Sequence, residues 1–309
     1  MTLRMDRTLA GLDQPQGISQ APEPDFICIG MQKAGTGWLF DQLQFHPDFW
    51  MPPVKQLHYL EHERTKPGTA EKFLRIARRN PVRRKMRLSH RREWDERDVA
   101  FLEQYVSYDG EPMDIEKYIT LFRYKGNCLS GEINSGYSGL GEETISALAQ
   151  RLPNLRVFII LRDPVARGWS QVSMAYRNEN FDIHLLDNPQ RFGVWLKTFP
   201  AINKVAYPSR IVGRWLRAAP KLEFKHFFFD LVADEPEEAR RQILLFLGAD
   251  PEKPSADLSA NHNRKSSDKK LELSDGIQMA LIEHFAEELR ACSRIFGGPA
   301  EAWATRYGI

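Results

Sequence analysis

A glycine-rich segment near the start of the chain has the residue types needed to bind a phosphate group. The apolar run 26–30 leads into a turn with glycines at 30, 35 and 37, and a helix-prone run begins at Thr36. Glycine permits backbone geometries in which consecutive amides point at one anion, and a helix N-terminus adds partial positive charge. Lys33 and Thr36 supply side-chain donors. The segment therefore predicts a phosphate-binding turn; the alternative is an ordinary tight turn.

The position of the lysine distinguishes two kinds of phosphate loop. In the nucleotide triphosphatase loop, G-x-x-x-x-G-K-[ST], the lysine follows the second glycine. Here Thr36 stands in that place and the lysine comes earlier, at Lys33. The order K-x-G-T-x-x-L, closed by Leu39, resembles the 5′-phosphosulfate loop of sulfotransferases that use 3′-phosphoadenosine-5′-phosphosulfate (PAPS).

This resemblance implies roles for the whole loop. Lys33 is expected to stabilise charge on the departing adenosine 3′,5′-bisphosphate, or alternatively to act as a plain phosphate anchor. The 5′-phosphate is expected to be held by the neighbouring loop residues, which are Ala34, Gly35, Thr36, Gly37 and Trp38.

A second motif follows another apolar run. Residues 156–161 are β-prone and apolar, and Arg162-Asp163-Pro164 comes next, with proline suited to a first helical turn. The pattern L-R-D-P-x-x-R-x-x-S resembles the family's 3′-phosphate signature, which implies that Arg162 and Ser170 hold the ribose 3′-phosphate. The planar guanidinium fork is well suited to that group. The alternative is an Arg162–Asp163 pair beside a helix-capping proline.

The proton acceptor departs from the family pattern. Residues 51–60, MPPVKQLHYL, resemble the P-P-x-K-E-x-H-[FY]-F segment of carbohydrate and heparan sulfate sulfotransferases, common in bacterial members. The catalytic glutamate of that pattern falls on Gln56, and an amide cannot accept a proton at neutral pH. Since a general base contributes about 10² to 10⁴ in rate, another group is needed.

Two residues are candidates for this base. In an extended segment residues two apart face the same way, so His58 is expected beside Gln56 in the pocket. Glu132 is the second candidate, because residues 131–137, GEINSGY, resemble the family's G-E-x-T-P-x-Y segment. A phenol, with a pKa near 10, surrenders its proton more easily than an alkyl hydroxyl, so a phenolic acceptor is one hypothesis.

A polar, basic loop near the C-terminus is a further cofactor candidate. Residues 261–266, NHNRKS, precede a terminal helix, where family members place a loop that closes over the nucleotide. Arg264 and Lys265 are therefore expected to reach the 3′-phosphate. A solvated loop without such a role is the alternative.

Strand-like runs alternate with helical periodicity along the chain. This alternation predicts an α/β fold with a parallel sheet flanked by helices, and the resemblance implies the three-layer P-loop NTPase-like form. Residues 1–24 are expected to be a flexible tail, and 25–309 a single domain with a basic, helical insertion at about 64–126. Strands are expected at 26–30, 128–133, 156–161 and 224–229, and helices at 36–45, 142–151, 164–178, 208–218, 236–247 and 274–295.

Composition limits the remaining functions. The formal net charge of +2 gives no global attraction to nucleic acid. The nine Lys or Arg residues in 75–92 favour a solvated helical face over an acidic partner, so nucleic acid binding is a third hypothesis. No apolar run could span a membrane, three widely spaced cysteines indicate a reducing compartment, and no cluster suggests a metal.

Together with these observations, the resemblance implies a cytoplasmic, bacterial, PAPS-dependent sulfotransferase that acts on a small-molecule or glycan hydroxyl without a metal. The alternatives are a nucleotide-binding protein of the same fold with impaired catalysis and a small-molecule kinase. A kinase is disfavoured by the misplaced lysine and by the lack of an acidic strand suited to magnesium. Acceptor identity and oligomeric state stay open.

Overall fold

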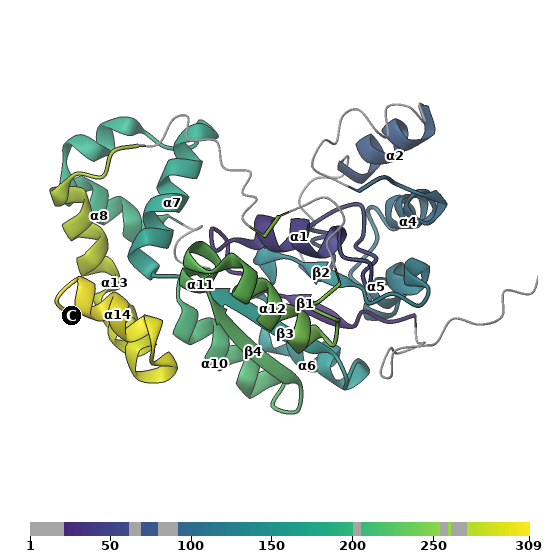
Figure 1. The fold of residues 1–309 in the computed structure, drawn as a ribbon. Coiled ribbons are helices and arrows are strands. Elements are labelled where there is room, and N and C mark those ends of the chain that lie inside the picture. The colour runs from purple at the N-terminus through teal and green to yellow at the C-terminus, as the bar shows by residue number, and fades with distance from the viewer. Residues whose placement is uncertain (1–21, 62–68, 80–91, 200–204, 254–258, 261–270) are drawn as a thin grey trace, which may run out of the picture.

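The computed structural model describes residues 22–61, 69–79, 92–199, 205–253, 259–260 and 271–309. Its centre is a four-stranded parallel sheet in the order β2-β1-β3-β4, flanked by helices as predicted (Figure 1). The strands are β1 (Phe26–Cys28), β2 (Gly131–Ile133), β3 (Arg156–Leu161) and β4 (Glu223–Phe228). The first three begin or end within three residues of their predicted limits, and β4 begins one residue earlier.

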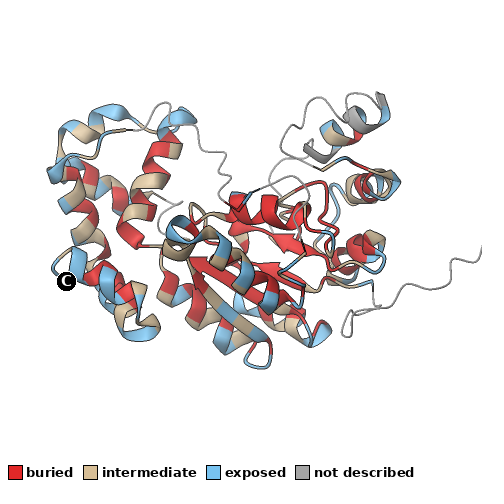
Figure 2. Ribbon diagram, viewed as in Figure 1, coloured by how far each residue is buried: buried red, intermediate tan, exposed pale blue. Residues whose placement is uncertain are grey.

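Burial explains why the runs around β1 and β3 are apolar. Every residue of β1 is buried, and Val157 to Leu161 of β3 are buried as well (Figure 2). Parallel strands covered by helices on their faces have this continuous apolar character. Phe26 pairs with Gly131 on one side and with Arg156 on the other, so β1 is an inner strand.

The six helices expected from the sequence are present, with ends within one residue of the prediction. They are α1 (Thr36–Gln44), α6 (Glu142–Arg151), α7 (Pro164–Arg177), α10 (Pro208–Ala218), α12 (Pro236–Leu247) and α13 (Asp275–Phe296). Further helices were not expected individually: α2 (Thr69–Arg79), α4 (Glu96–Ser107), α5 (Ile115–Thr120), α8 (Pro189–Thr198), α11 (Phe229–Asp234) and α14 (Pro299–Arg306). Figure 1 shows α7, α8, α13 and α14 grouped on one side of the sheet and α2, α4 and α5 on the other.

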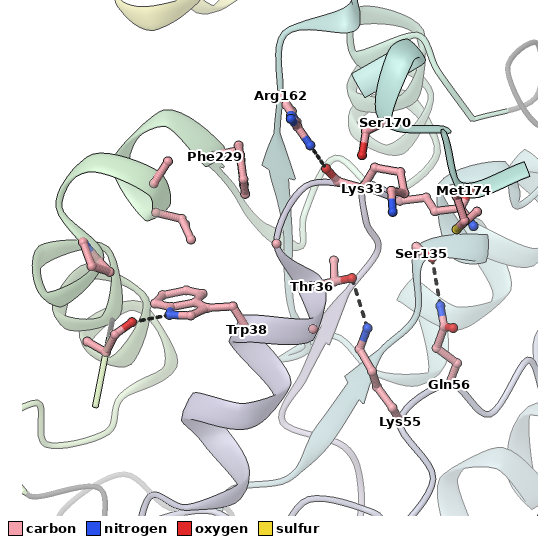
Figure 3. A pocket seen from close by; sticks show the side chains of 17 residues that line it. Lys33, Thr36, Trp38, Lys55, Gln56, Ser135, Arg162, Ser170, Met174 and Phe229 are labelled. Carbon is pink, nitrogen blue, oxygen red and sulfur yellow. Dashed lines mark hydrogen bonds between the residues drawn. The ribbon is translucent and has the colours of Figure 1, made fainter. Parts of the chain in front are cut away.

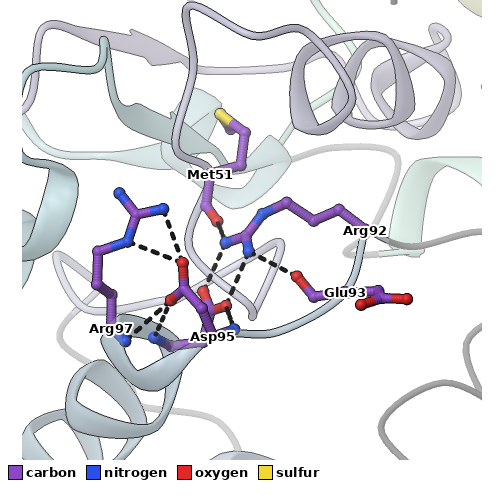
Figure 4. A network of polar contacts seen from close by, with 6 residues as sticks. Met51, Arg92, Glu93, Asp95 and Arg97 are labelled. Carbon is purple, nitrogen blue, oxygen red and sulfur yellow. Dashed lines mark hydrogen bonds and ion pairs between the residues drawn. The ribbon is translucent and has the colours of Figure 1, made fainter. Parts of the chain in front are cut away.

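Helices α2, α4 and α5 occupy the segment expected to be an insertion, most of whose basic run lies outside the described residues. Arg92, the last residue of that run, donates to both carboxylate oxygens of the buried Asp98, at 2.5 and 2.8 Å. It also donates to the Met51 carbonyl at 2.8 Å (Figure 4). This network ties the segment that begins at Arg92 to the segment that leads to Gln56.

Candidate active site

The strand order places a crevice between β1 and β3. From β1 the chain crosses to β2 on one side and then returns to β3 on the other, so the loops after β1 and β3 diverge from a topological switch point. Ligands of open α/β sheets bind at this position, outside the carboxyl ends of the strands. A cavity of about 570 Å³ lies there, lined by residues from both loops.

Eight of the residues predicted from the sequence line this cavity, namely Lys33, Gly35, Thr36, Gly37, Trp38, Gln56, Arg162 and Ser170. Three others, Ala34, His58 and Glu132, do not line it. Arg264 and Lys265 lie outside the described residues. The two sequence motifs, which lie more than 100 residues apart in the chain, therefore meet in one cavity.

Backbone geometry explains the glycine-rich spelling of the first loop. Gly35 has φ 82° at the N-cap of α1, in the left-handed region that glycine adopts without strain. A Cβ atom at this position would lie 3.1 Å from the Phe229 ring. Lys33 also has a positive φ, of 70°, which is uncommon for a residue with a side chain. The loop is therefore a specific turn, and backbone strain of this kind is often found at functional sites.

Arg162 holds this turn from the neighbouring strand. Its Nη1 donates to the Lys33 carbonyl at 2.5 Å, and its guanidinium lies 4.5 Å from the centre of the Phe229 ring (Figure 3). Asp163, which the alternative interpretation paired with Arg162, instead caps α7 by accepting from Val165 N at 2.8 Å and accepts from the Tyr307 hydroxyl at 2.7 Å. Arg162 is thus directed to the loop and the cavity.

Lys55 is a cavity residue to which the sequence analysis gave no role. Its Nζ donates to Thr36 Oγ1 at 3.1 Å, so a second lysine lies at the phosphate loop (Figure 3). The sequence does contain a signal for this residue, since Lys55 falls on the lysine of the P-P-x-K-E-x-H pattern.

Gln56 lies in the cavity wall as expected. Its Nε2 donates to Ser135 Oγ at 2.8 Å, which links the segment after α1 to the segment after β2 (Figure 3). Ser135 also lines the cavity and was not predicted as a site residue. The amide oxygen and the serine hydroxyl can form hydrogen bonds with a bound hydroxyl compound, but neither group is a base at neutral pH.

His58 does not share the orientation of Gln56. Its φ of 54° breaks the extended alternation on which the prediction rested. The ring lies outside the cavity, with Nδ1 at 3.0 Å from Glu61 Oε1. The hydrogen bond to Glu61 raises the pKa of His58, which favours the protonated form that cannot accept a proton.

Glu132 lies beneath the same segment and is 1% exposed. Its Oε1 accepts from the Leu57 amide at 2.7 Å and from Asn134 Nδ2 at 2.9 Å, and burial raises the pKa of this carboxyl. Tyr105 donates to the Leu57 carbonyl. These contacts hold the backbone that follows Gln56, which is a positioning role rather than direct access to the cavity.

Ala34 is fully buried, and its amide donates to the Met31 carbonyl at 3.2 Å. It therefore closes the turn internally. Among the described residues no group of His, Cys, Asp or Glu could hold a metal ion, and none of the described helices is long and apolar enough to cross a membrane.

The cavity is partly apolar. Trp38, Phe229, Val232 and Pro236 line it, and the Trp38 indole donates to the Ala260 carbonyl at 2.7 Å. Lys33, Lys55 and Arg162 line the same cavity, and the Arg162 guanidinium lies against the Phe229 ring. A ligand with an aromatic part and several negative charges matches this distribution.

Similarity to solved structures supports the description of the fold. No family model and no curated protein matches the chain. A sulfotransferase from Alicyclobacillus acidocaldarius aligns with a TM-score of 0.61 at 20% identity, covering 91% of this chain and 98% of that one. The sulfotransferase domain of the Synechococcus PCC 7002 olefin synthase gives 0.44 at 15% identity (89% and 98% covered), and a Mycobacterium avium sulfotransferase gives 0.40 at 15% (94% and 76%).

The first of these similarities shows the fold. The chain has the α/β fold of sulfotransferases, which is P-loop NTPase-like with a central parallel sheet between helices, as the sequence predicted.

Proposed function

We propose that this protein transfers a sulfuryl group from PAPS to a hydroxyl of a small-molecule or glycan acceptor and releases adenosine 3′,5′-bisphosphate. The observation that carries the proposal is the meeting of the two motifs: Thr36 of the first and Arg162 and Ser170 of the second line one cavity. A nucleotide with phosphates at both ends of its ribose requires such a divided site.

The residues present fit this cofactor. The first amides of α1 have no acceptor within the helix and can donate to the 5′-phosphate together with Thr36. Gly37 lines the cavity, and a Cβ atom there would meet nothing within 4 Å, so the approach to these amides is open. Arg162 and Ser170 would hold the 3′-phosphate. The aromatic faces of Trp38 and Phe229 would take the adenine.

The cofactor supplies the sulfuryl group, and the chain supplies position and charge. Transfer of such a group depends mainly on alignment and on fixed positive charge where negative charge develops. Lys33 would stabilise the leaving group. Lys55, which is hydrogen-bonded to Thr36 Oγ1, would contact the sulfuryl oxygens from the side of Gln56.

The acceptor is proposed to be a hydroxyl that ionises readily, as a phenol does. Among the described cavity residues the ionisable side chains are Lys33, Lys55 and Arg162, all cations. An ammonium group favours the anionic form of a nearby phenol. To serve as the base instead, His58 would have to leave Glu61 and turn toward the cavity, and His58→Ala tests that role.

The decisive experiment is a calorimetric titration of the protein with adenosine 3′,5′-bisphosphate and, separately, with ATP and magnesium, followed by sulfation assays with phenols and sugars. We expect tight binding of the bisphosphate and sulfated phenol. Preference for ATP would favour the kinase alternative, and turnover of sugars alone would contradict the phenolic acceptor.

A nucleotide-binding protein without catalysis is the second candidate, because Gln56 replaces the expected base and is bonded to Ser135 at 2.8 Å. Bisphosphate binding without sulfation of any acceptor would favour it.

A further inference from the structure

Arg167 of α7 is a fully buried cation to which the proposed function assigns no role. The residue is 0% exposed, and its one hydrogen bond to a described residue is long, from Nη1 to the Gln32 carbonyl at 3.4 Å. Its Nε and Nη2 have no hydrogen-bond partner in the part of the chain that the structure describes. Within those same residues no carboxylate forms an ion pair with it.

Such a group is costly to keep in a folded protein. A buried charge normally has a paired counter-charge, and an unpaired one is strongly destabilising. Burial, and then the charge of Arg162, lower the pKa of Arg167 to about 10, so the guanidinium still carries its charge at neutral pH. Arg162 therefore lies close enough to Arg167 for the two positive charges to interact.

The position of Arg167 indicates which anion is involved. Gln32 lines the cavity, and its carbonyl faces Arg167 on the protein side of the loop. The next carbonyl, of Lys33, is bonded to Arg162. The peptide between Gln32 and Lys33 is trans, so the Lys33 amide points away from Arg167. One peptide thus separates the buried cation from the anion-binding side of the loop.

We propose that Arg167 is a positioning residue of the nucleotide site, whose buried charge orients the phosphate loop and is compensated only when an anionic nucleotide occupies the cavity. This inference rests on the proposed function. In the empty protein the charge lowers stability, and nucleotide binding removes that penalty. Affinity and stability are therefore opposed at this residue.

A purely structural arginine would behave in the opposite way. If Arg167 only filled space and bonded to Gln32, its loss would destabilise the empty protein and leave nucleotide affinity unchanged. Replacement of a buried, poorly paired charge by an apolar side chain of similar volume is often neutral or stabilising. The two interpretations predict opposite changes in the stability of the empty protein when Arg167 is replaced. Only the positioning role predicts a loss of nucleotide affinity.

The test uses Arg167→Met and Arg167→Lys, with Arg156→Met as the matched control. Arg156 lies at the start of β3, at the end of the sheet away from the cavity, and donates to Glu223 and to the Leu247 carbonyl. For each full-length protein, the melting temperature without ligand and the Kd for adenosine 3′,5′-bisphosphate are measured.

We expect the Met variant to melt at or above the wild-type temperature and to bind the bisphosphate about 10-fold or more weakly. The Lys variant, which keeps the charge, should recover most of the affinity, and Arg156→Met should leave Kd unchanged. A Met variant that is less stable when empty, fails to fold, or binds as tightly as wild type would overturn the inference alone. Absence of binding by the wild type would overturn the proposed function and the inference with it.

Discussion

In the proposed function, Lys55 and Lys33 supply positive charge where the phosphosulfate would lie. Lys55 is bonded to Thr36 Oγ1, whose hydroxyl is expected to contact the 5′-phosphosulfate. The two lysines belong to different segments, so their charges can act on different oxygens. Lys33 is assigned to the leaving group and Lys55 to the group in transfer.

Lys55→Met tests this division. We expect kcat to fall about 10² to 10³-fold, because a donor aimed at developing charge is lost. Affinity for adenosine 3′,5′-bisphosphate, which has no sulfuryl group, should change little. Steady-state kinetics and calorimetry on the same protein measure both, with the exposed Lys221→Met as control. An equal loss of bisphosphate affinity would show that Lys55 is a phosphate anchor.

Gln56→Glu should restore a carboxylate to the cavity wall. Ser135, now the acceptor of the Gln56 hydrogen bond, can donate to that carboxylate instead. We expect turnover of alkyl hydroxyl acceptors to rise by about 10² or more, with less change for phenols, which need the base less. Competition assays with both acceptor types measure the shift. Unchanged selectivity would contradict the proposed role of acceptor acidity.

The His58–Glu61 pair predicts a pH dependence of stability. Because the pKa of His58 is raised in the folded protein, its contribution is fully present below the unfolded pKa of about 6.5 and is lost as pH rises through the folded pKa. His58→Gln should therefore lower the melting temperature at about pH 6 and have little effect at about pH 9. A difference from wild type that is constant across this range would contradict the prediction.

At the scale of elements, the sequence was most informative where proline, glycine or polar residues mark the end of one element and the start of the next. Pro164 and the polar Arg162-Asp163 pair mark the boundary between β3 and α7, and the structure has both elements there. The glycines of the first loop likewise located the turn before α1. Such signals are local, so one sequence is sufficient to place Arg162 and Thr36.

Orientation within irregular segments could not be predicted. The alternation that placed His58 beside Gln56 assumes an extended backbone, but His58 has φ 54°. Glu132 is buried because residues 57–60 pack over the end of β2. The hydrogen bond from the Leu57 amide to Glu132 joins residues that are 75 positions apart in the chain. Lys55 reaches Thr36 for the same tertiary reason. Helices α8 and α14 depend on packing against α13 and were not expected.

Close packing of β2 on β1 gives an element-scale prediction. A Cβ atom at Gly131 would lie 2.1 Å from the Phe26 carbonyl oxygen, a contact that backbone cannot relieve without moving the strand. Gly131→Ala should cost more than about 3 kcal/mol in the free energy of unfolding. Denaturant titration measures this loss. Gly141→Ala, whose Cβ would meet nothing within 4 Å, should remain within about 0.5 kcal/mol.

At the scale of the whole molecule, the cavity brings together segments that are far apart in the chain. The cavity takes residues from α1, from the segment after it, from α7 and from α11, and Asp163 at the start of α7 is bonded to Tyr307. A ligand in this cavity therefore contacts segments from most of the chain. Its binding free energy is available to stabilise the fold as a unit.

Thermal unfolding should show this coupling. At a bisphosphate concentration of 100 Kd, stabilisation of about 2.7 kcal/mol is expected, which raises the melting temperature by several degrees. Differential scanning calorimetry of the full chain, with and without ligand, measures it. A ligand that binds in the calorimetric titration but leaves the melting temperature unchanged would argue against a site shared by these segments.

The hydrogen bond from Trp38 to the Ala260 carbonyl has a consequence for the fluorescence of the protein. Trp38 is the tryptophan that lines the cavity among the described residues, and its indole is fixed against a backbone dipole rather than free in solvent. An adenine stacked on this ring would alter its emission directly. Intrinsic fluorescence can therefore report occupancy of the site in real time, without a label and before any acceptor has been identified.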